Sequence, residues 1–195
     1  LTEASPVVTA AYGLPWRPGS VGAPVDGVEV RLVDVDGEDA LVGDPGEIWV
    51  RGPNVFHGYW NDEEATNAAL DAEGWLHTGD VAVKDPDGFL RIVDRKKDMI
   101  VTGGFNVFPS EVENVIATHP AVAQVAVFGI ADEKWGEAVC AAVVLRPGAK
   151  ADPAELTALV KTHKGSVQAP KRIEFIDAIP QTAVGKPDKK ALRAQ

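Results

Sequence analysis

Three residues in polar segments of the sequence are suited to contacting a nucleotide. Asp80 ends the segment Trp75–Asp80 (WLHTGD) at an expected turn, where a fixed carboxylate could accept hydrogen bonds from a ribose diol. Arg95 presents a forked set of donors that suits phosphate, and Lys186 carries an ammonium group on a flexible stem that could reach a phosphoryl group. Taken alone, each is better explained as a turn-capping aspartate, a solvated linker arginine or a surface lysine.

The first half of the sequence, which must position Asp80, is predicted to be mostly β. Residues 1–27 are rich in proline and glycine and predict loop. Further along, alternating apolar residues predict strands, and acids followed by helix formers predict one short helix. These elements are strands at 28–34 and 46–52, a helix at 61–70, and a hairpin over 75–94.

The second half has a mixed pattern that begins after the charged run 94–98. Its predicted elements are strands at 99–102, 122–130, 138–145 and 172–176, and helices beginning near 110, near 152 and at 188. Ser110 and Glu113 match a capping box, and Asp152 is expected to cap the next helix. Between the first strand and helix, Gly103-Gly104 would allow positive φ or a close backbone approach to a ligand. The order β-α-β-β-α-β predicts a small α+β sandwich of about 100 residues.

Composition and charge indicate a globular protein with two differently charged halves. The 195 residues carry a formal net charge of −10, and 45% of them are apolar. Residues 1–94 hold 18 acids and 5 bases, whereas residues 95–195 hold 11 acids and 14 bases. The acidic whole argues against nucleic-acid binding. The mildly basic second half could still meet a polyanion such as ATP or coenzyme A.

The number of cysteines and the lengths of the apolar runs indicate the cellular compartment in which the protein is expected. A single cysteine, Cys140, excludes an intramolecular disulfide and favours a reducing, cytoplasmic compartment. The longest apolar stretches, around 122–131 and 138–145, are too short to form a transmembrane segment. No signal peptide precedes the first residue, Leu1, and we expect the chain to begin partway into a longer protein.

Taken together, the polar segments form a specific combination. The sequences WLHTGD at 75–80, DRKKDMI followed by GGFNVFPSEVE at 94–113, and PQTAVGK at 180–186 stand in this order. They resemble the adenylate-forming superfamily, which includes acyl-CoA synthetases, luciferase-like enzymes and the adenylation domains of peptide synthetases. The resemblance covers essentially the whole chain. At its start, Thr2-Glu3 resembles the end of the family's Tyr-Gly-x-Thr-Glu segment, whose Tyr-Gly part is absent.

The resemblance implies a role for each matching residue. Nucleotide contacts fall to Thr2 (phosphate), Asp80 (ribose hydroxyls) and Arg95 (ribose and phosphates). The remaining roles are a Mg²⁺ ligand at Glu3, a hinge at Lys97, a loop lining the pantetheine tunnel at Gly103, Gly104 and Phe105, and the catalytic lysine at Lys186. Four further residues match no catalytic role and are interpreted as structural: His57, Trp60, His119 and Cys140. His77, at a variable position near Asp80, is interpreted as incidental.

The resemblance also implies a fold and a reaction. The fold is α+β, with residues 1–96 as the β-rich end of a large AMP-binding domain and residues 97–195 as a mobile C-terminal lid. A carboxylic acid, favoured to be a fatty acid, would react with Mg·ATP to give an acyl-adenylate. The lid would then swing about Lys97, and the thiol of coenzyme A would attack the adenylate to form a thioester.

Two features of this family are absent from the sequence. No Gly/Ser/Thr-rich loop that could cradle the β- and γ-phosphates occurs, and the acyl pocket of family members lies further upstream. We therefore expect the chain to be the C-terminal part of a larger synthetase, inactive without the upstream part. Three alternatives stay open: a peptide-synthetase adenylation domain, a CoA-independent acyl-AMP ligase, and a non-catalytic module that binds CoA or nucleotide or dimerises.

Overall fold

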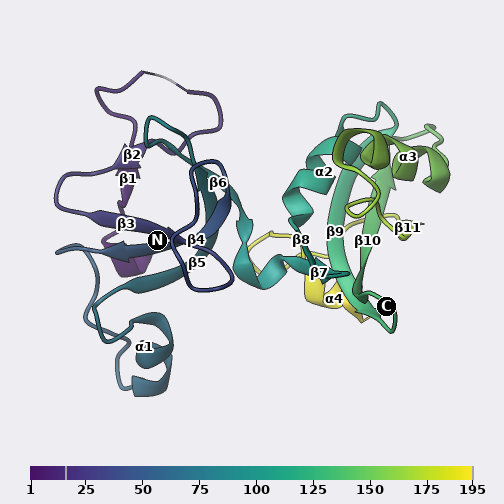
Figure 1. Ribbon diagram of the computed structural model, residues 1–195. Coiled ribbons are helices and arrows are strands. Elements are labelled where there is room, and N and C mark those ends of the chain that lie inside the picture. Colours follow the sequence, from purple (N-terminus) through teal and green to yellow (C-terminus); the bar gives the residue numbers. More distant parts are fainter. Residues whose placement is uncertain (16, 195) are drawn as a thin grey trace. The chain divides into compact units, whose positions relative to one another are not determined.

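The chain forms two compact units, one ending at Lys97 and the other beginning at Asp98 (Figure 1). The structure is a computed structural model that describes residues 1–15 and 17–194. Each unit buries an apolar core of its own. Both units contain sheets and helices, so the predicted α+β class is confirmed. Among the described residues, no helix is both long enough and apolar enough to span a bilayer.

The first unit is built on a four-stranded antiparallel sheet in the order β3-β4-β5-β6. Its strands are β3 (Glu29–Val33), β4 (Pro45–Arg51), β5 (Leu76–Lys84) and β6 (Leu90–Arg95). One helix, α1 (Glu63–Ala69), begins at the N-cap Asp62, whose carboxylate accepts the N–H of Ala65 at 2.9 Å. The predicted strands, helix and hairpin of this half all exist. The 1–27 region, expected to be loop, also holds the short elements η1 (Thr2–Ala4), β1 (Thr9–Ala10) and β2 (Ala23–Pro24).

The pairing of β4 with β5 is interrupted at one point. Glu47 pairs with Val81 and Trp49 with His77, so residues 78–80 of β5 lie opposite a single residue of β4. Gly79 adopts a φ of 70° inside this bulge, a conformation that glycine reaches without steric cost. The bulge turns the backbone next to Asp80 out of the regular ladder.

The second unit is a five-stranded sheet with helices on both faces. Its elements are β7 (Ile100–Thr102), β8 (Phe105–Val107), α2 (Pro109–Ala117), β9 (Val122–Asp132), β10 (Gly136–Leu145), α3 (Pro153–Lys164), β11 (Arg172–Phe175) and α4 (Lys189–Arg193). β10 pairs antiparallel with β9 along its length and parallel with β11. Its first residue, Gly136, joins it to β7, which pairs with β8.

Side-chain alternation in β10 explains the two covered faces. Val139, Ala141 and Val143 enter the core shared with α2 and α3, whereas Cys140 and Ala142 enter a second core that includes Leu192 of α4. A strand buried on both sides has a continuous apolar run in its sequence, as residues 138–145 do. Cys140 is therefore a core residue, in agreement with its structural interpretation, and burial raises the pKa of its thiol.

The predicted capping box of the second unit is wrong, and one strand was not predicted. α2 begins after Phe108, with Pro109 in its first turn and no side-chain cap, so Ser110 lies inside the helix rather than at its N-cap. Glu113 instead uses Oε1 to accept the N–H of Val127 at 2.8 Å. In addition, the sequence does not predict β8, because its three residues are too few to show a periodic pattern. The predicted cap of α3 is confirmed: Asp152 accepts the N–H of Ala154 at 2.8 Å.

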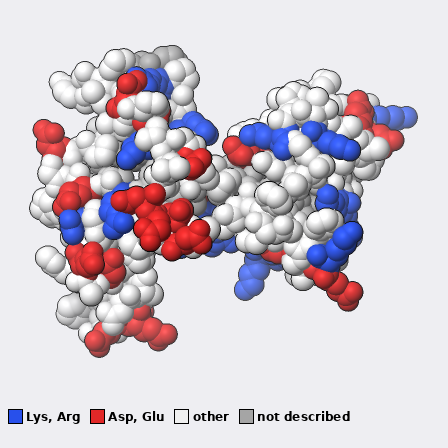
Figure 2. Space-filling model, viewed as in Figure 1, with Lys and Arg blue, Asp and Glu red and all other residues white. Residues whose placement is uncertain are grey.

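Charge is distributed unevenly over the two units (Figure 2). Acidic side chains gather on the visible face of the first unit, whereas lysines and arginines are spread over the second. When the charges are counted by unit, residues 1–97 hold 18 acids and 8 bases, and residues 98–195 hold 11 of each. The second unit is thus neutral rather than basic, because Arg95, Lys96 and Lys97 belong to the first.

Candidate functional site

Asp80 and Arg95 form an ion pair between two neighbouring strands of the first unit. They are direct cross-strand partners on β5 and β6, and the distance from Oδ1 of Asp80 to Nε of Arg95 is 2.6 Å. Their side chains are 24% and 53% exposed, so a ligand can reach both. The Asp80 N–H donates to the hydroxyl of Thr78 at 3.1 Å, and that hydroxyl donates to the carbonyl of Ile48 at 2.8 Å. The pair is therefore preformed and held by the bulge.

A mostly apolar pocket of about 260 Å³ lies beside Asp80. It is lined by Leu1, Pro6, Val7, Val8, Thr9, Val21, Ile48, Val50, Thr78, Asp80 and Ile92. Small-molecule sites commonly combine apolar walls with a few placed polar groups. An apolar wall with one carboxylate at its edge suits a flat ring joined to a hydroxyl-bearing group, which is the form of a nucleoside.

Glu3 belongs to the same electrostatic neighbourhood. Its carboxylate accepts a hydrogen bond from the hydroxyl of Tyr59 at 2.9 Å, and its carbonyl accepts the N–H of Phe56 at 2.8 Å. Its own backbone N–H, the Tyr59 hydroxyl, the charged N-terminus of Leu1 and, with the smallest effect, the charge of Arg95 hold the pKa of Glu3 below its usual range. Glu3 is therefore ionised at neutral pH. Thr2, beside it in η1, is exposed.

The donor set at Glu3 fits a cation that arrives with its own ligands. Among the described residues, no cluster of three or more carboxylate, histidine or cysteine side chains could hold a metal ion. Mg²⁺ usually keeps several waters and is bound by one or two carboxylates together with substrate phosphates. A single ionised, partly exposed carboxylate is compatible with that mode of binding.

Lys186 projects from a closed loop in the second unit. The N–H of Thr182 donates to the carbonyl of Lys186 at 2.8 Å, and the N–H of Lys186 donates back to the hydroxyl of Thr182 at 3.3 Å. A third bond runs from the N–H of Asp188 to the carbonyl of Pro180 at 2.7 Å. The side chain of Lys186 is exposed. The backbone is therefore fixed, and the exposed ammonium group can reach a ligand.

Gly103 and Gly104 form the two-residue turn between β7 and β8. Their φ values of 58° and 81° are typical of the turn type that matches strand twist in tight hairpins. The turn leaves Phe105 exposed at the start of β8. The N–H of Gly103 donates to the carbonyl of Trp135 at 2.8 Å, and a Cβ on Gly103 would lie 3.0 Å from the Trp135 ring. Glycine at 103 is thus required by both conformation and close approach.

A pocket of about 120 Å³ lies against this turn. It is lined by Thr102, Gly103, Phe105, Trp135, Ser166, Val167 and Lys171. Two ammonium groups lie over the Trp135 ring, Lys134 at 4.7 Å and Lys171 at 5.9 Å from its centroid. The sequence pattern does not identify Trp135 and Lys171 as pocket residues. They lie more than 30 residues from the glycine turn, and no local pattern connects them to it.

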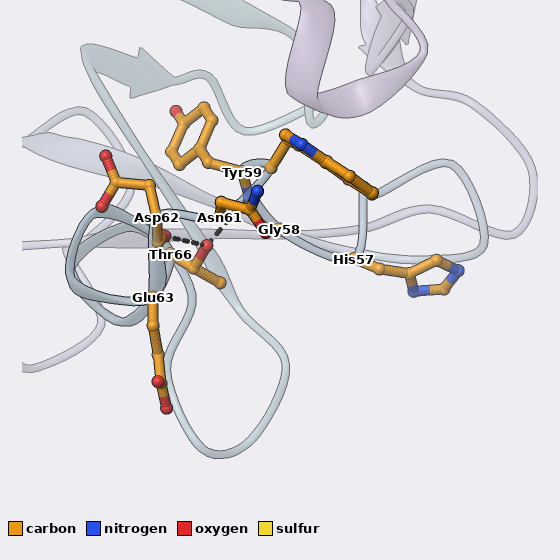
Figure 3. A pocket seen from close by; sticks show the side chains of 8 residues that line it. His57, Gly58, Tyr59, Asn61, Asp62, Glu63 and Thr66 are labelled. Atoms are coloured by element: carbon orange, nitrogen blue, oxygen red, sulfur yellow. Dashed lines mark hydrogen bonds between the residues drawn. The ribbon is translucent and has the colours of Figure 1, made fainter.

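A hollow in the first unit lies around the start of α1 (Figure 3). It encloses about 610 Å³ and is lined by His57, Gly58, Tyr59, Trp60, Asn61, Asp62, Glu63 and Thr66. The Thr66 hydroxyl accepts the N–H of Tyr59 at 2.9 Å and donates to the carbonyl of Asp62 at 2.7 Å, which fixes the loop onto the helix. His57 and Trp60 are both exposed at this hollow, so burial does not support the structural interpretation given to them.

Lys97 lies at the junction of the two units. It is exposed in the short 3₁₀ turn Lys96–Asp98 and is the last residue of the first unit. Its neighbour Lys96 is anchored, because Nζ of Lys96 donates to Oε2 of Glu47 at 2.9 Å. Of the predicted site residues, the structure thus brings Asp80, Arg95 and Glu3 into one neighbourhood. Gly103–Phe105 and Lys186 lie in the other unit, and Lys186 is not part of the Phe105 pocket.

Two family models match the chain. Residues 1–60 match the AMP-binding enzyme family, and residues 111–186 match the AMP-binding enzyme C-terminal domain. A medium/long-chain fatty-acid–CoA ligase of Mycobacterium tuberculosis is 56% identical over 183 residues, which are 90% of this chain and 32% of that protein. The chain spans about a third of the length of the curated relatives it matches.

Solved structures show the same fold at substantial identity. An o-succinylbenzoate–CoA synthetase from Bacillus subtilis, in complex with its acyl-adenylate intermediate, aligns with a TM-score of 0.85 and 34% identity. The alignment covers 99% of this chain and 40% of that protein. An amide bond synthetase from Marinactinospora thermotolerans aligns with a TM-score of 0.82 and 46% identity, over 90% of this chain and 36% of that protein.

Proposed function

Since the chain belongs to the AMP-binding enzyme family, the adenylate-forming superfamily that its motifs resemble, we propose that it forms part of an AMP-forming acid–CoA ligase. One observation carries the proposal. The Asp80–Arg95 pair, with its Oδ1–Nε distance of 2.6 Å, stands at the edge of an apolar pocket that suits a nucleoside. The substrates would be a carboxylic acid, ATP and coenzyme A.

In the first half-reaction, the chain's own residues bind the nucleotide and stabilise charge. Asp80 accepts hydrogen bonds from the ribose hydroxyls, and Arg95 and Thr2 donate to the ribose and phosphate oxygens. The acid's carboxylate attacks the α-phosphorus, the bond to the bridging oxygen of pyrophosphate breaks, and acyl-AMP and pyrophosphate result. Lys186, whose ammonium group is exposed on a fixed loop, stabilises the negative charge on the phosphoryl oxygens.

The ionised Glu3 is the residue of this chain that fits Mg²⁺. When bound there with the ATP phosphates, Mg²⁺ would supply charge neutralisation at the phosphoryl oxygens. Tyr59 orients the Glu3 carboxylate through their 2.9 Å hydrogen bond.

In the second half-reaction, the glycine turn and its pocket receive coenzyme A. The small Gly103-Gly104 turn leaves room for the pantetheine chain, and Phe105 and Trp135 offer apolar walls. Lys171 and Lys134 place positive charge beside Trp135, which suits the phosphates of the CoA nucleotide. The CoA thiol gives its proton to water as its sulfur attacks the acyl carbon, the bond from that carbon to the AMP phosphate oxygen breaks, AMP leaves, and a thioester forms.

The two half-reactions use different residues of the second unit, and we propose that the units alternate between them. Residues 1–96 would be the end of the large AMP-binding domain and residues 97–195 the lid. Rotation about Lys97 would move Lys186 away from the acyl-adenylate and bring the Gly103–Phe105 turn to it. The exposure of Lys97 next to the anchored Lys96 supports a pivot at this residue.

A fatty acid is the proposed acyl substrate. The 56% identity to the fatty-acid–CoA ligase of M. tuberculosis supports this choice. A second candidate is CoA-independent transfer of the acyl group to an amine, supported by the 46% identity to an amide bond synthetase. Supplying the full-length protein with fatty and aromatic acids, ATP, and either CoA or an amine separates these functions by the product formed.

The decisive test removes the charge of Lys186 in the full-length protein. Lys186→Ala should lower adenylate formation, measured as ATP–pyrophosphate exchange, by about 10²-fold or more, because a group that stabilises developing charge is lost. Thioester formation from supplied acyl-adenylate should be spared. Lys190→Ala, at an exposed lysine four residues away, is the matched control and should leave both steps unchanged. Equal loss of both half-reactions in Lys186→Ala would refute the assignment.

A further inference from the structure

Glu47 is a buried carboxylate at the centre of the sheet that carries Asp80 and Arg95. The residue is 7% exposed, and charged side chains are rarely buried unless they are paired and hydrogen-bonded. Three donors converge on it: Trp49 Nε1 at 3.0 Å, the Gly79 N–H at 3.0 Å and Lys96 Nζ at 2.9 Å. Every one of these donors lies in the first unit.

The donors connect Glu47 to both members of the Asp80–Arg95 pair. Gly79 directly precedes Asp80 in the bulge of β5, where its N–H points to a side chain instead of a strand neighbour. Lys96 directly follows Arg95 at the end of β6. The two oxygens of one carboxylate therefore hold the backbone before Asp80 and the side chain after Arg95.

This arrangement has a geometric consequence for ligand binding. The Asp80–Arg95 distance depends on the bulge of β5 and on the end of β6, where two ladder pairs, Asp80–Arg95 and Val81–Asp94, lie beyond a register shift between Val81 and Ala82. A shift of either segment would separate the ribose-binding carboxylate from its guanidinium partner. Catalytic and binding groups lose much of their effect when misplaced by about 1 Å.

We propose that Glu47 is a positioning residue, which holds Asp80 and Arg95 in the paired arrangement that receives the nucleotide. The nucleotide part of this role rests on the function proposed above. An ordinary buried ion pair would contribute only to stability. A positioning residue must in addition change the Asp80–Arg95 contact and the affinity for nucleotide when its charge is removed.

The first experiment needs no activity. In the 195-residue chain, solvent exchange of the Arg95 Nε–H is measured by NMR for the wild type and for Glu47→Gln and Lys96→Met. Gln keeps one acceptor oxygen, which can still accept from Gly79, but its NH₂ group replaces the oxygen that accepts from Trp49 and Lys96, and the charge that holds Lys96 is lost. We expect exchange of the Arg95 Nε–H to be at least about tenfold faster in both variants, as the hydrogen bond to Asp80 loosens.

A matched control lies in the same sheet. Glu29 of β3 pairs with Arg51 of β4 through two hydrogen bonds of 3.0 and 2.9 Å. Glu29→Gln should accelerate exchange of the Arg51 Nε–H and leave that of Arg95 unchanged. An Arg95 Nε–H that exchanges at the wild-type rate in Glu47→Gln would overturn the proposal.

The second experiment measures the dissociation constant of AMP for the full-length protein by calorimetry. We expect it to rise about tenfold in Glu47→Gln and in Lys96→Met, with no further rise in the double variant, because both act through one contact. Glu47→Gln with lowered thermal stability but unchanged AMP affinity would refute positioning. If the wild type binds no AMP, the nucleotide function fails, and the exchange rates alone decide whether Glu47 positions the pair.

Discussion

Glu47 stays ionised in a buried position because three donors replace the water that it loses. Burial by itself would raise the pKa of Glu47, but the hydrogen bonds from Lys96, Trp49 and Gly79 outweigh it and lower that pKa. Glu3 follows the same logic nearer the surface, with its own N–H and the Tyr59 hydroxyl as donors. At the residue scale, Glu3 and Glu47 are therefore two carboxylates whose charge is maintained by placed donors.

The lowered pKa of Glu47 predicts how stability depends on pH. A carboxyl group whose pKa is depressed by folding contributes stability above its unfolded value, near 4.5, and that contribution is lost as the pH falls through the folded pKa. At pH 7 we expect Glu47→Gln to be less stable than the wild type by about 1–3 kcal/mol. The difference should shrink as the pH falls below about 4.5.

Urea unfolding of the 195-residue chain at several pH values between 3 and 7 measures this difference. Glu29→Gln serves as the control, since its exposed ion pair with Arg51 should contribute little at any pH. A stability gap between wild type and Glu47→Gln that stays constant down to pH 3 would show that the ionised form of Glu47 is not the stabilising one.

The turn of the β7–β8 hairpin is constrained both by its backbone conformation and by packing against a neighbouring side chain. Gly103 and Gly104 both have positive φ, but only Gly103 also approaches another side chain closely. A Cβ at 103 would lie 3.0 Å from the ring of Trp135, whereas a Cβ at 104 would meet no atom within 4 Å. The two positions therefore differ in packing and share their backbone conformation.

Because of this difference in packing, Gly103→Ala and Gly104→Ala can be compared as a matched pair of variants. Gly104→Ala should destabilise the chain by roughly 1–2 kcal/mol, the cost of the left-handed conformation for a residue with a Cβ. Gly103→Ala should cost more, because the Trp135 ring must also move, and should shift the tryptophan fluorescence. Denaturant unfolding with fluorescence detection measures both effects. Equal costs and identical spectra would mean that Trp135 does not constrain the turn.

The elements that could be predicted from the sequence are those specified by local patterns. Asp152 followed by a proline gives a cap and a first turn, and the structure confirms the helix there. Ser110 and Glu113 fit the same kind of rule, but that prediction is wrong. The N-cap of the helix is Phe108, two residues before Ser110, and Glu113 bonds instead to β9 and to Lys189 at 3.0 Å. A pattern over a few neighbouring residues contains no information about hydrogen-bond partners that are distant in the sequence.

The same limit applies to the candidate site. Asp80, Arg95 and Lys186 belong to short motifs, so the sequence alone is enough to single them out. Glu47 belongs to no such motif, since its significance depends on a strand register that places it beside Gly79 and Lys96, 32 and 49 residues away. The motif residues proposed to contact ligands are visible in the sequence, and the residues that position them become visible only in the fold.

At the scale of the whole molecule, charge follows the units rather than the halves of the sequence. The second unit is neutral, with 11 acids and 11 bases, and the basic run Arg95–Lys97 belongs to the first unit. Arg95 and Lys96 are each paired with a carboxylate, at 2.6 and 2.9 Å. The expectation of a basic lid is therefore replaced by a narrower one: positive charge for CoA comes from individual lysines such as Lys134 and Lys171 beside Trp135.

The proposed alternation of the two units predicts an unequal effect of stiffening Lys97. Proline at 97 fixes φ there and also restricts Lys96, the residue held by Glu47. In the full-length protein, Lys97→Pro should slow thioester formation at least about tenfold, a rise of ~1.4 kcal/mol in its barrier, and affect adenylate formation less. Lys97→Ala leaves the backbone free and should change neither step. Because Lys97 is exposed, unfolding of the lid is not the expected reason for any loss. If Lys97→Pro impairs adenylate formation more than thioester formation, the pivot lies elsewhere and the units do not alternate about this residue.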